Sequence, residues 1–356
     1  MKQNKLLLKL IPPLLLGVTA CTKSEEKKEL LPKQEIVSEI KTINGQEYRF
    51  EGNKVTQVSS DPDNRALYGV ISDAHGEVER ATLFAEYFKE LGVEGIISLG
   101  DMASNEPLRY GRKDTKDDKA EIKAVLEVLA QTNLPIFVIP GNHERKPDYE
   151  AVLSEMTAKY SNLIDMTVFR IFDGDDADFV SLPGYQTFKI PGRQFIPDDG
   201  YWAKPDFIRA TGKLREGLDD AVVLIAHGAG KTNTDGKNGP ATIYSGKDVG
   251  DTTTTEMMKQ NNIPFAVVGH IHEAGGLAAT HEGEEVKQGE WVKQFTANFG
   301  SLETWKYLNG ETHDGMGGVF VIKGEQASFH TLQLLNFPGE GLIFQSVFKS
   351  PQNLYK

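Results

Sequence analysis

The chain has 356 residues, of which 39% are hydrophobic and 25% are charged, so it is long enough to bury a sizeable core as one large domain or two modest ones. Its formal net charge of −12 repels phosphate backbones, which argues against general nucleic-acid binding. A single cysteine excludes an internal disulfide.

Residues 1–20 have the features of a secretory signal peptide. Lys2 and Lys5 give a positive start, and residues 6–18 form an apolar stretch interrupted by Lys9. The stretch is shorter than the roughly 20 apolar residues that are needed to span a bilayer. It is therefore typical of a signal peptide and not of a membrane-spanning helix.

This stretch ends in Val18-Thr19-Ala20-Cys21, which resembles a bacterial lipobox, where the cysteine receives a lipid and becomes the new N-terminus. We therefore predict lipid attachment at Cys21; a chance cysteine in an ordinary signal peptide is the less favoured alternative. Residues 21–40 are rich in Lys and Glu and are predicted to be a solvated tether. The resemblance implies export and lipid anchoring to the bacterial cell envelope, at the outer membrane facing the periplasm if the host is Gram-negative.

The next part of the chain alternates apolar runs with helical stripes, after a hairpin or edge segment predicted at 41–60. The apolar runs predict buried strands at residues 66–72, 96–99, 136–139, 222–226 and 265–268. Apolar residues at helical spacing predict helices at 78–91, 122–129, 151–160 and 254–260. Strands that alternate with helices imply right-handed crossovers and a mainly parallel sheet.

The C-terminal part has strand-like segments with little helix between them, which predicts a second, more antiparallel sheet. The segments are 291–297, 317–323, 327–335 and 342–348. We therefore predict an α/β fold, a four-layer α/β/β/α sandwich with mixed sheets, in one domain at 41–356. The stretch 173–215 is rich in Asp, Gly and Pro and is predicted to be an irregular insertion.

Each of the five apolar runs in the alternating part ends next to a metal-competent side chain. The side chains are, in chain order, Asp73 with His75, Asp101, Asn142, His227, and His270 with His272. Ligands bind beyond the carboxyl ends of strands in α/β sheets, so we expect these groups to converge. Residues two apart in an extended segment point the same way, so the members of each pair can face one site. Adjacent glycines allow sharp turns and close backbone approach.

This donor set contains oxygen and imidazole groups without a thiolate, which suits divalent Mn, Fe, Zn or similar ions. Two such ions about 3.5–4 Å apart clamp the attacking and the leaving oxygen of a phosphoryl displacement, and they lower the pKa of a bound water so that hydroxide forms near neutral pH. The pattern therefore predicts a dinuclear metal centre.

The blocks D-x-H, G-D, G-N-H-E, H and G-H-x-H follow one another between residues 73 and 272, and in this order they resemble the calcineurin-like metallophosphoesterase family. The resemblance implies hydrolysis of a phosphomonoester or phosphodiester by metal-activated hydroxide, with a phosphorylated small molecule or nucleotide as substrate. Met102-Ala103-Ser104 and the Gly-Ala-Gly after His227 depart from many relatives. These departures bear on the substrate pocket and not on the metal ligands.

The resemblance also implies a role for each residue. The first ion would be held by Asp73, His75 and His272, the second by Asn142, His227 and His270, and Asp101 would bridge the two. His143 would not bind metal; it would protonate the leaving oxygen or stabilise the transition state beside the phosphate.

Each of these residues alone also has a structural explanation, because an Asp after a strand is often a helix N-cap and an Asn is often a turn residue. For the whole protein, the alternative is a non-catalytic surface lipoprotein that uses the fold for ligand binding. The full ligand set and His143 argue against it, since degenerate relatives normally lose ligands. The sequence leaves open the metals, the oligomeric state, and monoester against diester.

Three features outside the blocks receive structural interpretations. The acidic run from Asp173 to Asp178 lacks the spacing of an EF-hand loop, so we interpret it as a solvated loop. Residues 228–246 follow a predicted ligand directly and are expected to rim the pocket or act as a lid. Aromatic residues of the predicted insertion, such as Tyr185 and Tyr201, are interpreted as local packing in preference to stacking on a base or sugar.

Overall fold

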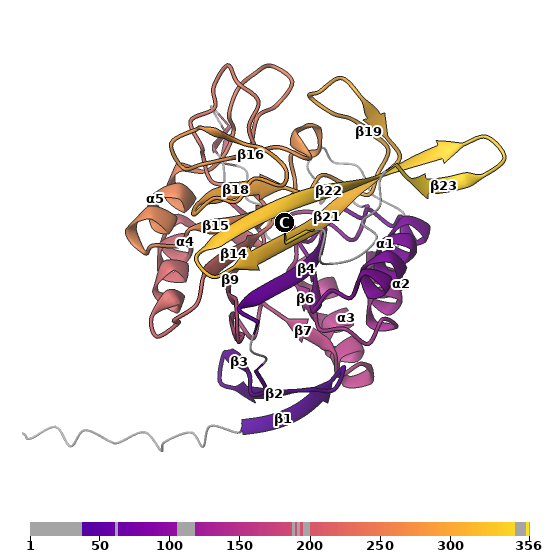
Figure 1. Ribbon diagram of the computed structural model, residues 1–356, viewed down its shortest axis with the longest axis vertical. Coiled ribbons are helices and arrows are strands. Elements are labelled where there is room, and N and C mark those ends of the chain that lie inside the picture. Colours follow the sequence, from indigo (N-terminus) through magenta and orange to yellow (C-terminus); the bar gives the residue numbers. More distant parts are fainter. Residues whose placement is uncertain are drawn as a thin grey trace, which may run out of the picture. The chain divides into compact units, whose positions relative to one another are not determined.

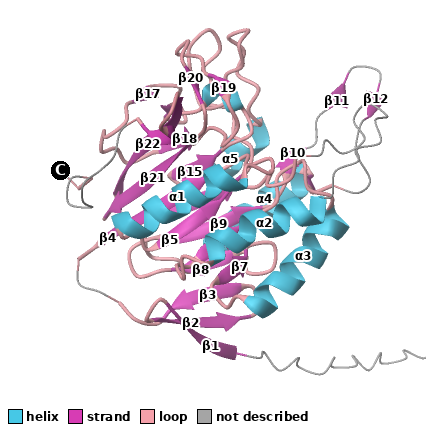
Figure 2. Cartoon of the chain, turned by 90° about the vertical axis from the view of Figure 1, so that its right-hand side faces the viewer, coloured by secondary structure: helices cyan, strands magenta, loops and turns pink. Residues whose placement is uncertain are grey.

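Two facing β-sheets with helices on their outer faces make up the fold (Figures 1 and 2). The computed structural model describes residues 38–60, 63–104, 118–186, 189–190, 193–194, 200–345 and 354–355, and residues 37–356 form one compact unit. The predicted signal peptide, Cys21 and the tether up to residue 37 lie outside the described residues. Within the described ranges, no helix combines the length and the apolar character needed to cross a membrane.

The first sheet has seven strands in the order β23-β22-β21-β4-β5-β6-β7. They are β4 (Arg65–Ile71), β5 (Gly95–Ser98), β6 (Ile136–Val138), β7 (Leu163–Asp165), β21 (Met316–Lys323), β22 (Gln326–Phe337) and β23 (Gly341–Phe344). Strands β4 to β7 run parallel, whereas β21 pairs antiparallel with β4 and continues into the β22–β23 hairpin. The sheet is therefore mixed, with its change of direction at β4.

The second sheet has ten strands in the order β1-β2-β3-β8-β9-β14-β15-β18-β16-β17. They are β1 (Ser38–Ile43), β2 (Gln46–Glu51), β3 (Lys54–Gln57), β8 (Ile171–Asp173), β9 (Asp178–Leu182), β14 (Val222–Ala226), β15 (Phe265–Val268), β18 (Phe295–Asn298), β16 (Ala278–Ala279) and β17 (Glu285–Val286). Its centre, β9-β14-β15-β18, is parallel. Three two-stranded ribbons lie outside both sheets: β10 (Tyr185–Gln186) with β13 (Trp202–Ala203), β11 (Lys189–Ile190) with β12 (Arg193–Gln194), and β19 (Trp305–Lys306) with β20 (Thr312–His313).

Helices cover the outer face of each sheet. The seven-stranded sheet carries α1 (Val78–Leu91), α2 (Asp118–Ala130) and α3 (Lys146–Lys159), and the ten-stranded sheet carries α4 (Pro205–Gly212) and α5 (Thr252–Gln260) (Figure 1). Two short 3-10 helices, η1 (Lys213–Arg215) and η2 (His272–Ala274), complete the described elements.

Alternation along the central strands separates the layers of the core. In β4, Leu67 packs in the cluster that faces α1 and α2, whereas Tyr68 packs between the sheets. In β14, Leu224 faces α4 and α5, whereas Val223 lies between the sheets. Successive side chains of a strand point to opposite faces, so each sheet is buried on both sides. This confirms the predicted four-layer sandwich.

The predicted division of strands between the two sheets is wrong. The C-terminal strands do not form a sheet of their own; they extend the sheet of β4, because β21 pairs with β4 from Arg65 to Val70. The parallel strands divide instead, with β4 to β7 in one sheet and β14 and β15 in the other. The strand predicted to begin at 291 begins at Phe295. The stretch 173–215 is less irregular than expected, since β9 lies within it as a central, fully buried strand.

Candidate metal centre

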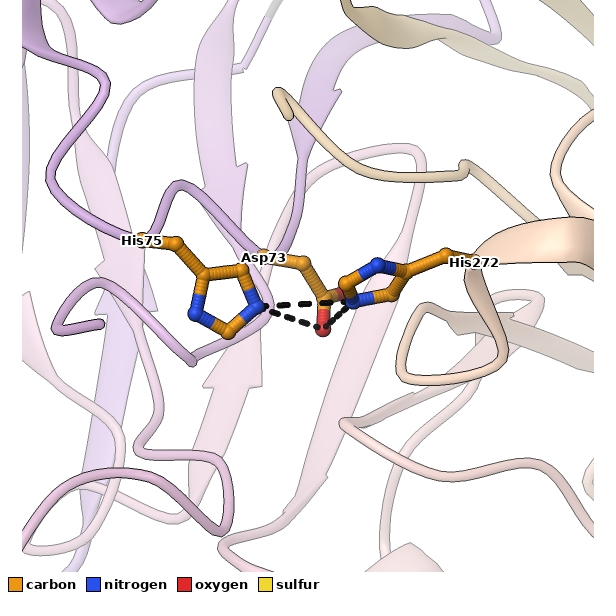
Figure 3. A group of neighbouring side chains, drawn as sticks. All are labelled: Asp73, His75 and His272. Atoms are coloured by element: carbon orange, nitrogen blue, oxygen red, sulfur yellow. Dashed lines mark hydrogen bonds and ion pairs between the residues drawn. The ribbon is translucent and has the colours of Figure 1, made fainter. Parts of the chain in front are cut away.

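Asp73, His75 and His272 come together although they lie almost 200 residues apart in the chain (Figure 3). The Nε2 atom of His272 lies 3.1 Å from Oδ1 of Asp73 and 3.4 Å from Nε2 of His75. Asp73 follows β4 of the first sheet, and His272 follows β15 of the second. The two sheets thus contribute to one group, which matches the set that the sequence assigned to the first ion.

A second group surrounds the imidazole of His227, at the end of β14. Its Nε2 atom lies 3.0 Å from Oδ2 of Asp101, 3.2 Å from Oδ1 of Asn142 and 3.1 Å from Nδ1 of His270. His227 is fully buried and Asp101 is 1% exposed. All four predicted ligands of this group therefore meet at one buried point.

Asp101 lies between the two groups. Its carboxylate shares one potential ligand cluster with His227 and His270 and another with His75 and His143. The backbone N–H of His143 donates to Oδ1 of Asp101 at 2.8 Å, and the imidazole Nε2 of His143 lies 3.8 Å from Oδ2. All seven predicted ligands and His143 are thus brought together, with Asp101 in the place expected of a bridging group.

Two of the imidazoles are anchored so that one nitrogen faces the site. His75 Nδ1 lies 3.1 Å from the carbonyl oxygen of Ala103, and His227 Nδ1 lies 2.9 Å from that of Leu99. In a neutral imidazole, a ring nitrogen that donates to a carbonyl leaves the other nitrogen as an acceptor. Nε2 of both residues therefore points at the carboxylates and at other imidazoles, and in the neutral ring it presents the lone pair that a metal ligand needs.

The backbone at the ligands adopts a conformation that side chains seldom tolerate. Positive φ angles of 51°, 44°, 52° and 64° occur at Asp73, His75, Asp101 and His270, and the other non-glycine residues with positive φ among the described residues are all asparagines. This conformation costs on the order of 1–3 kcal/mol per residue and persists where the surroundings impose it, often at functional sites. Four predicted ligands share it.

Glycines allow the ligand loops to approach one another. A Cβ atom on Gly100 would lie 2.2 Å from the backbone nitrogen of Gly141, and one on Gly269 would lie 1.9 Å from Oγ of Ser72. Both contacts are far inside van der Waals distance, so no side chain fits there. The glycines beside the ligands are therefore required by the packing of the loops, as their position after the strands predicted.

Glu144 supports the site, and the sequence analysis assigned it no role. Its buried carboxylate accepts hydrogen bonds from the backbone N–H groups of Asp101, Met102, Ala103 and Gly141. These donors belong to the loops that carry Asp101 and Asn142, so one carboxylate fixes both. Its position directly after His143 in the G-N-H-E block was the available signal.

Asn298, at the end of β18, supports the remaining ligand loop and was also missed. Its amide donates to the carbonyl oxygens of Pro240, Gly269 and Ile271, at 2.9, 3.1 and 3.0 Å. These carbonyls flank His270 and the loop after His227. Asn298 lies outside every recognisable block, and its partners are distant in the chain, so no sequence signal pointed to it.

Three further side chains border the ligands. The ring of Tyr185 lies 3.8 Å from that of His270, and the ring of Trp305 lies 4.6 Å from that of His272. Oε2 of Glu303 lies 3.9 Å from His75 Nε2 and 3.8 Å from His272 Nδ1. Tyr185 therefore packs against a ligand, whereas Glu303 adds negative charge at the edge of the site. Residues 228–246, which are predicted to rim the pocket or act as a lid, are held by residues outside that segment: buried Asp248 accepts from the backbone N–H groups of Thr232 and Thr234, and Asn298 donates to the carbonyl of Pro240.

The electrostatics of the site favour a cation. Burial would raise the pKa values of Asp73 and Asp101, but His227 and other histidines outweigh it and hold both below the usual range. Burial would lower the pKa of His227, but Asp101 and Asp73 raise it to about 9. Burial and the charge on His227 hold the pKa of His270 well below its usual value. Without metal, a proton on His227 supplies the positive charge that the carboxylates require.

The donor set fits a pair of divalent ions. Two buried imidazole nitrogens that face each other at 3.1 Å, His227 Nε2 and His270 Nδ1, are stable only with a proton or a cation between them. Carboxylate, amide and imidazole donors without thiolate suit Mn, Fe or Zn. Asp101 of the second group also shares a potential ligand cluster with His75 of the first group, so the two groups are adjacent, as a pair of ions requires.

Comparisons with known proteins identify the family and the fold. A family model for calcineurin-like phosphoesterases matches residues 67–274, which is more than half of the chain. The solved structure of TT1561 from Thermus thermophilus is similar with a TM-score of 0.51 at 10% sequence identity, over 74% of this chain and 98% of that one. A dimetal phosphatase from Danio rerio is similar with a TM-score of 0.46 at 12% identity, over 76% of this chain and 99% of that one. No curated protein matches the chain significantly.

Glu144→Gln tests the support that this carboxylate gives to both loops. The amide would turn an NH₂ group toward backbone N–H donors, so we expect a loss of about 1–3 kcal/mol of unfolding free energy together with weaker metal binding. Urea unfolding and bound metal per chain measure the two effects. Glu150→Gln, on the exposed face of α3, is the matched control; equal behaviour of the two variants would contradict the role of Glu144.

The stability of the metal-free protein should depend on pH through His227. Its pKa is about 9 in the folded chain and about 6.5 when unfolded. A raised histidine pKa stabilises the fold fully below the unfolded value, and this contribution is lost as pH rises through the folded value. In EDTA, the unfolding free energy should therefore fall between about pH 6.5 and pH 9. With manganese the fall should be smaller, because the ion replaces the proton; equal slopes would contradict this account.

Proposed function

Because the chain belongs to the calcineurin-like phosphoesterase family, we propose that it is a hydrolase that cleaves phosphomonoesters or phosphodiesters at a dinuclear metal centre. The observation that carries the proposal is the convergence of all seven predicted ligands on two adjacent groups, which Asp101 links because it clusters with His227 and His270 and also with His75. The substrate class, a phosphorylated small molecule or nucleotide, is part of the proposal.

The ligand assignment follows the two groups. Asp73, His75 and His272 would hold one ion, Asn142, His227 and His270 the other, and Asp101 both. When bound, two divalent ions supply Lewis-acid stabilisation of the phosphoryl group and a nucleophile at neutral pH. Two sets of hydrogen bonds hold the ligands in place before any ion binds. His75 and His227 each contact a backbone carbonyl through Nδ1, and Glu144 accepts from four backbone N–H groups of the ligand loops.

His143 is not one of the seven proposed metal ligands, and we assign it a role toward the substrate. Its side chain is 17% exposed, and its Nε2 atom is 3.8 Å from Oδ2 of Asp101, so it lies at the edge of the ligand groups and within reach of a bound ester. From there it would donate a proton to the leaving oxygen, or a hydrogen bond to the charge that develops on the phosphoryl group.

The first experiment compares hydrolysis of bis-(p-nitrophenyl) phosphate and p-nitrophenyl phosphate by the manganese-loaded protein. Asp101→Asn should abolish hydrolysis and lower metal content while the fold persists, because the carboxylate that links the two ligand groups is lost. His143→Ala should lower kcat by about 10²–10⁴-fold while metal content stays unchanged.

An exposed aspartate, changed as Asp206→Asn on α4, is the matched control and should behave as the original protein. Full activity of Asp101→Asn would refute the metal centre, and loss of both ions from His143→Ala would refute its separate role. The faster of the two esters identifies the enzyme as a phosphodiesterase or a phosphomonoesterase.

We also propose that the protein is exported and held at the bacterial cell envelope by a lipid on Cys21. The support is the sequence Val18-Thr19-Ala20-Cys21 at the end of the apolar stretch. In a bacterial host, Cys21→Ser should abolish incorporation of labelled palmitate and move the protein from the membrane to the soluble fraction, with hydrolysis unchanged. An original chain that carries no label would overturn this proposal without affecting the catalytic one.

A further inference from the structure

A second group of acidic residues lies at the opposite end of the strands that carry the metal centre. Asp173 ends β8 and Asp178 begins β9, and the two residues face each other across this antiparallel pair. Asp219 lies just before β14, whose Val222 is paired with Asp178. Strands β9 and β14 are parallel, and β14 leads at its carboxyl end to His227. The acidic group is therefore at the amino ends of β9 and β14, remote from the histidines.

These three carboxylates are close enough to share one ion. One oxygen from each lies within 4.8 Å of the others. Oxygen ligands stand about 2.3–2.6 Å from a bound Ca²⁺, so two ligands of one ion are separated by no more than about twice that distance. The group differs from the metal centre in its donors, because it contains oxygen only and no imidazole.

Asp178 supplies the observation that points to a ligand. Its side chain is fully buried; one oxygen, Oδ2, accepts a hydrogen bond of 2.9 Å from the backbone N–H of Asp220. The other, Oδ1, is buried and has no hydrogen-bond partner among the described residues. Burial of a carboxylate oxygen without a partner is costly. Burial, followed by the charges of Asp173, Asp220 and Asp219, raises the pKa of Asp178 to about 7. The burial of Asp178 at the start of β9 corrects the interpretation of this run as a solvated loop.

The protein's own cations do not satisfy this group. The ammonium group of Lys54 lies 2.5 Å from Oδ2 of Asp173, and Thr56 donates to the same oxygen. Lys54 therefore offsets one of the three carboxylates. No ion pair to Asp178 or Asp219 occurs within the described part of the chain, and Asp220 adds a further acid beside Asp178.

We propose that Asp173, Asp178 and Asp219 bind one hard divalent cation of the calcium class, at a site separate from the histidine-containing centre. Oxygen-only donors suit Ca²⁺, which accepts six to eight of them and completes its shell with carbonyls and water. The ion ties the β8–β9 hairpin to the segment that enters β14. It stabilises the fold from the end opposite the catalytic loops and takes no part in hydrolysis.

The test measures calcium binding by the full-length chain in detergent, after the histidine-containing centre has been saturated with manganese. Equilibrium dialysis with ⁴⁵Ca should find one calcium ion per chain at millimolar calcium. The midpoint temperature of unfolding should rise with calcium concentration, on the order of a few degrees, as expected for a ligand that binds only the folded state. Hydrolysis of the p-nitrophenyl esters should stay the same.

Asp219→Asn is the main variant, because this residue is exposed and its loss leaves the buried strands intact. It should weaken calcium binding at least tenfold and remove the calcium-dependent rise, and Asp178→Asn should do the same if it folds. Asp206→Asn, an aspartate exposed on α4, should bind as the original chain does. Failure of the original chain to bind calcium, or unchanged binding by Asp219→Asn, would overturn the proposal. Neither result bears on the catalytic assignment, which the manganese-dependent activity reports.

Discussion

Two carboxylates buried side by side without bulk water are the constraint around which the catalytic end of the protein is built. Asp73 and Asp101 are 0% and 1% exposed, and an uncompensated charge in such a place costs several kcal/mol or more. Imidazoles that follow strands of the second sheet, His227 and His272, contact the carboxylates Asp101 and Asp73 of the first sheet. Contacts between the two sheets at this end therefore run from carboxylate to imidazole, and the same groups are the predicted metal ligands.

Holding those ligands requires a second set of groups that never contact the cation. Glu144 collects four backbone N–H groups from two loops, and Asn298 collects three carbonyl groups from two others. One side chain is thus an acceptor hub and the other a donor hub. Together they support the positive φ angles of Asp101 and His270, because the backbone groups at or beside these residues have hydrogen-bond partners.

The sequence predicted the residues of the site better than it predicted which strands pair with one another. Asp73 follows an apolar run directly and His270 follows one after a single glycine, so the local pattern was enough to place them at strand ends. The pairing of β21 with β4 and the contacts of Asn298 depend on residues far apart in the chain, which no local period encodes. Asp178 was misread for a related reason: the acids that precede it, Asp173, Asp175 and Asp176, suggest a polar loop, and its burial comes from pairing with β14.

The antiparallel pairing of β21 with β4, which joins Gly318 to Val70, has a kinetic consequence. Such a contact closes a loop of roughly 250 residues, and contacts of this sequence separation form slowly. Until β21 arrives, β4 is an edge strand with an unpaired row of backbone groups and a template for association with other chains. Asp73 follows that strand. A chain that is interrupted before residue 316 therefore keeps every predicted metal ligand and still lacks the strand that completes their support.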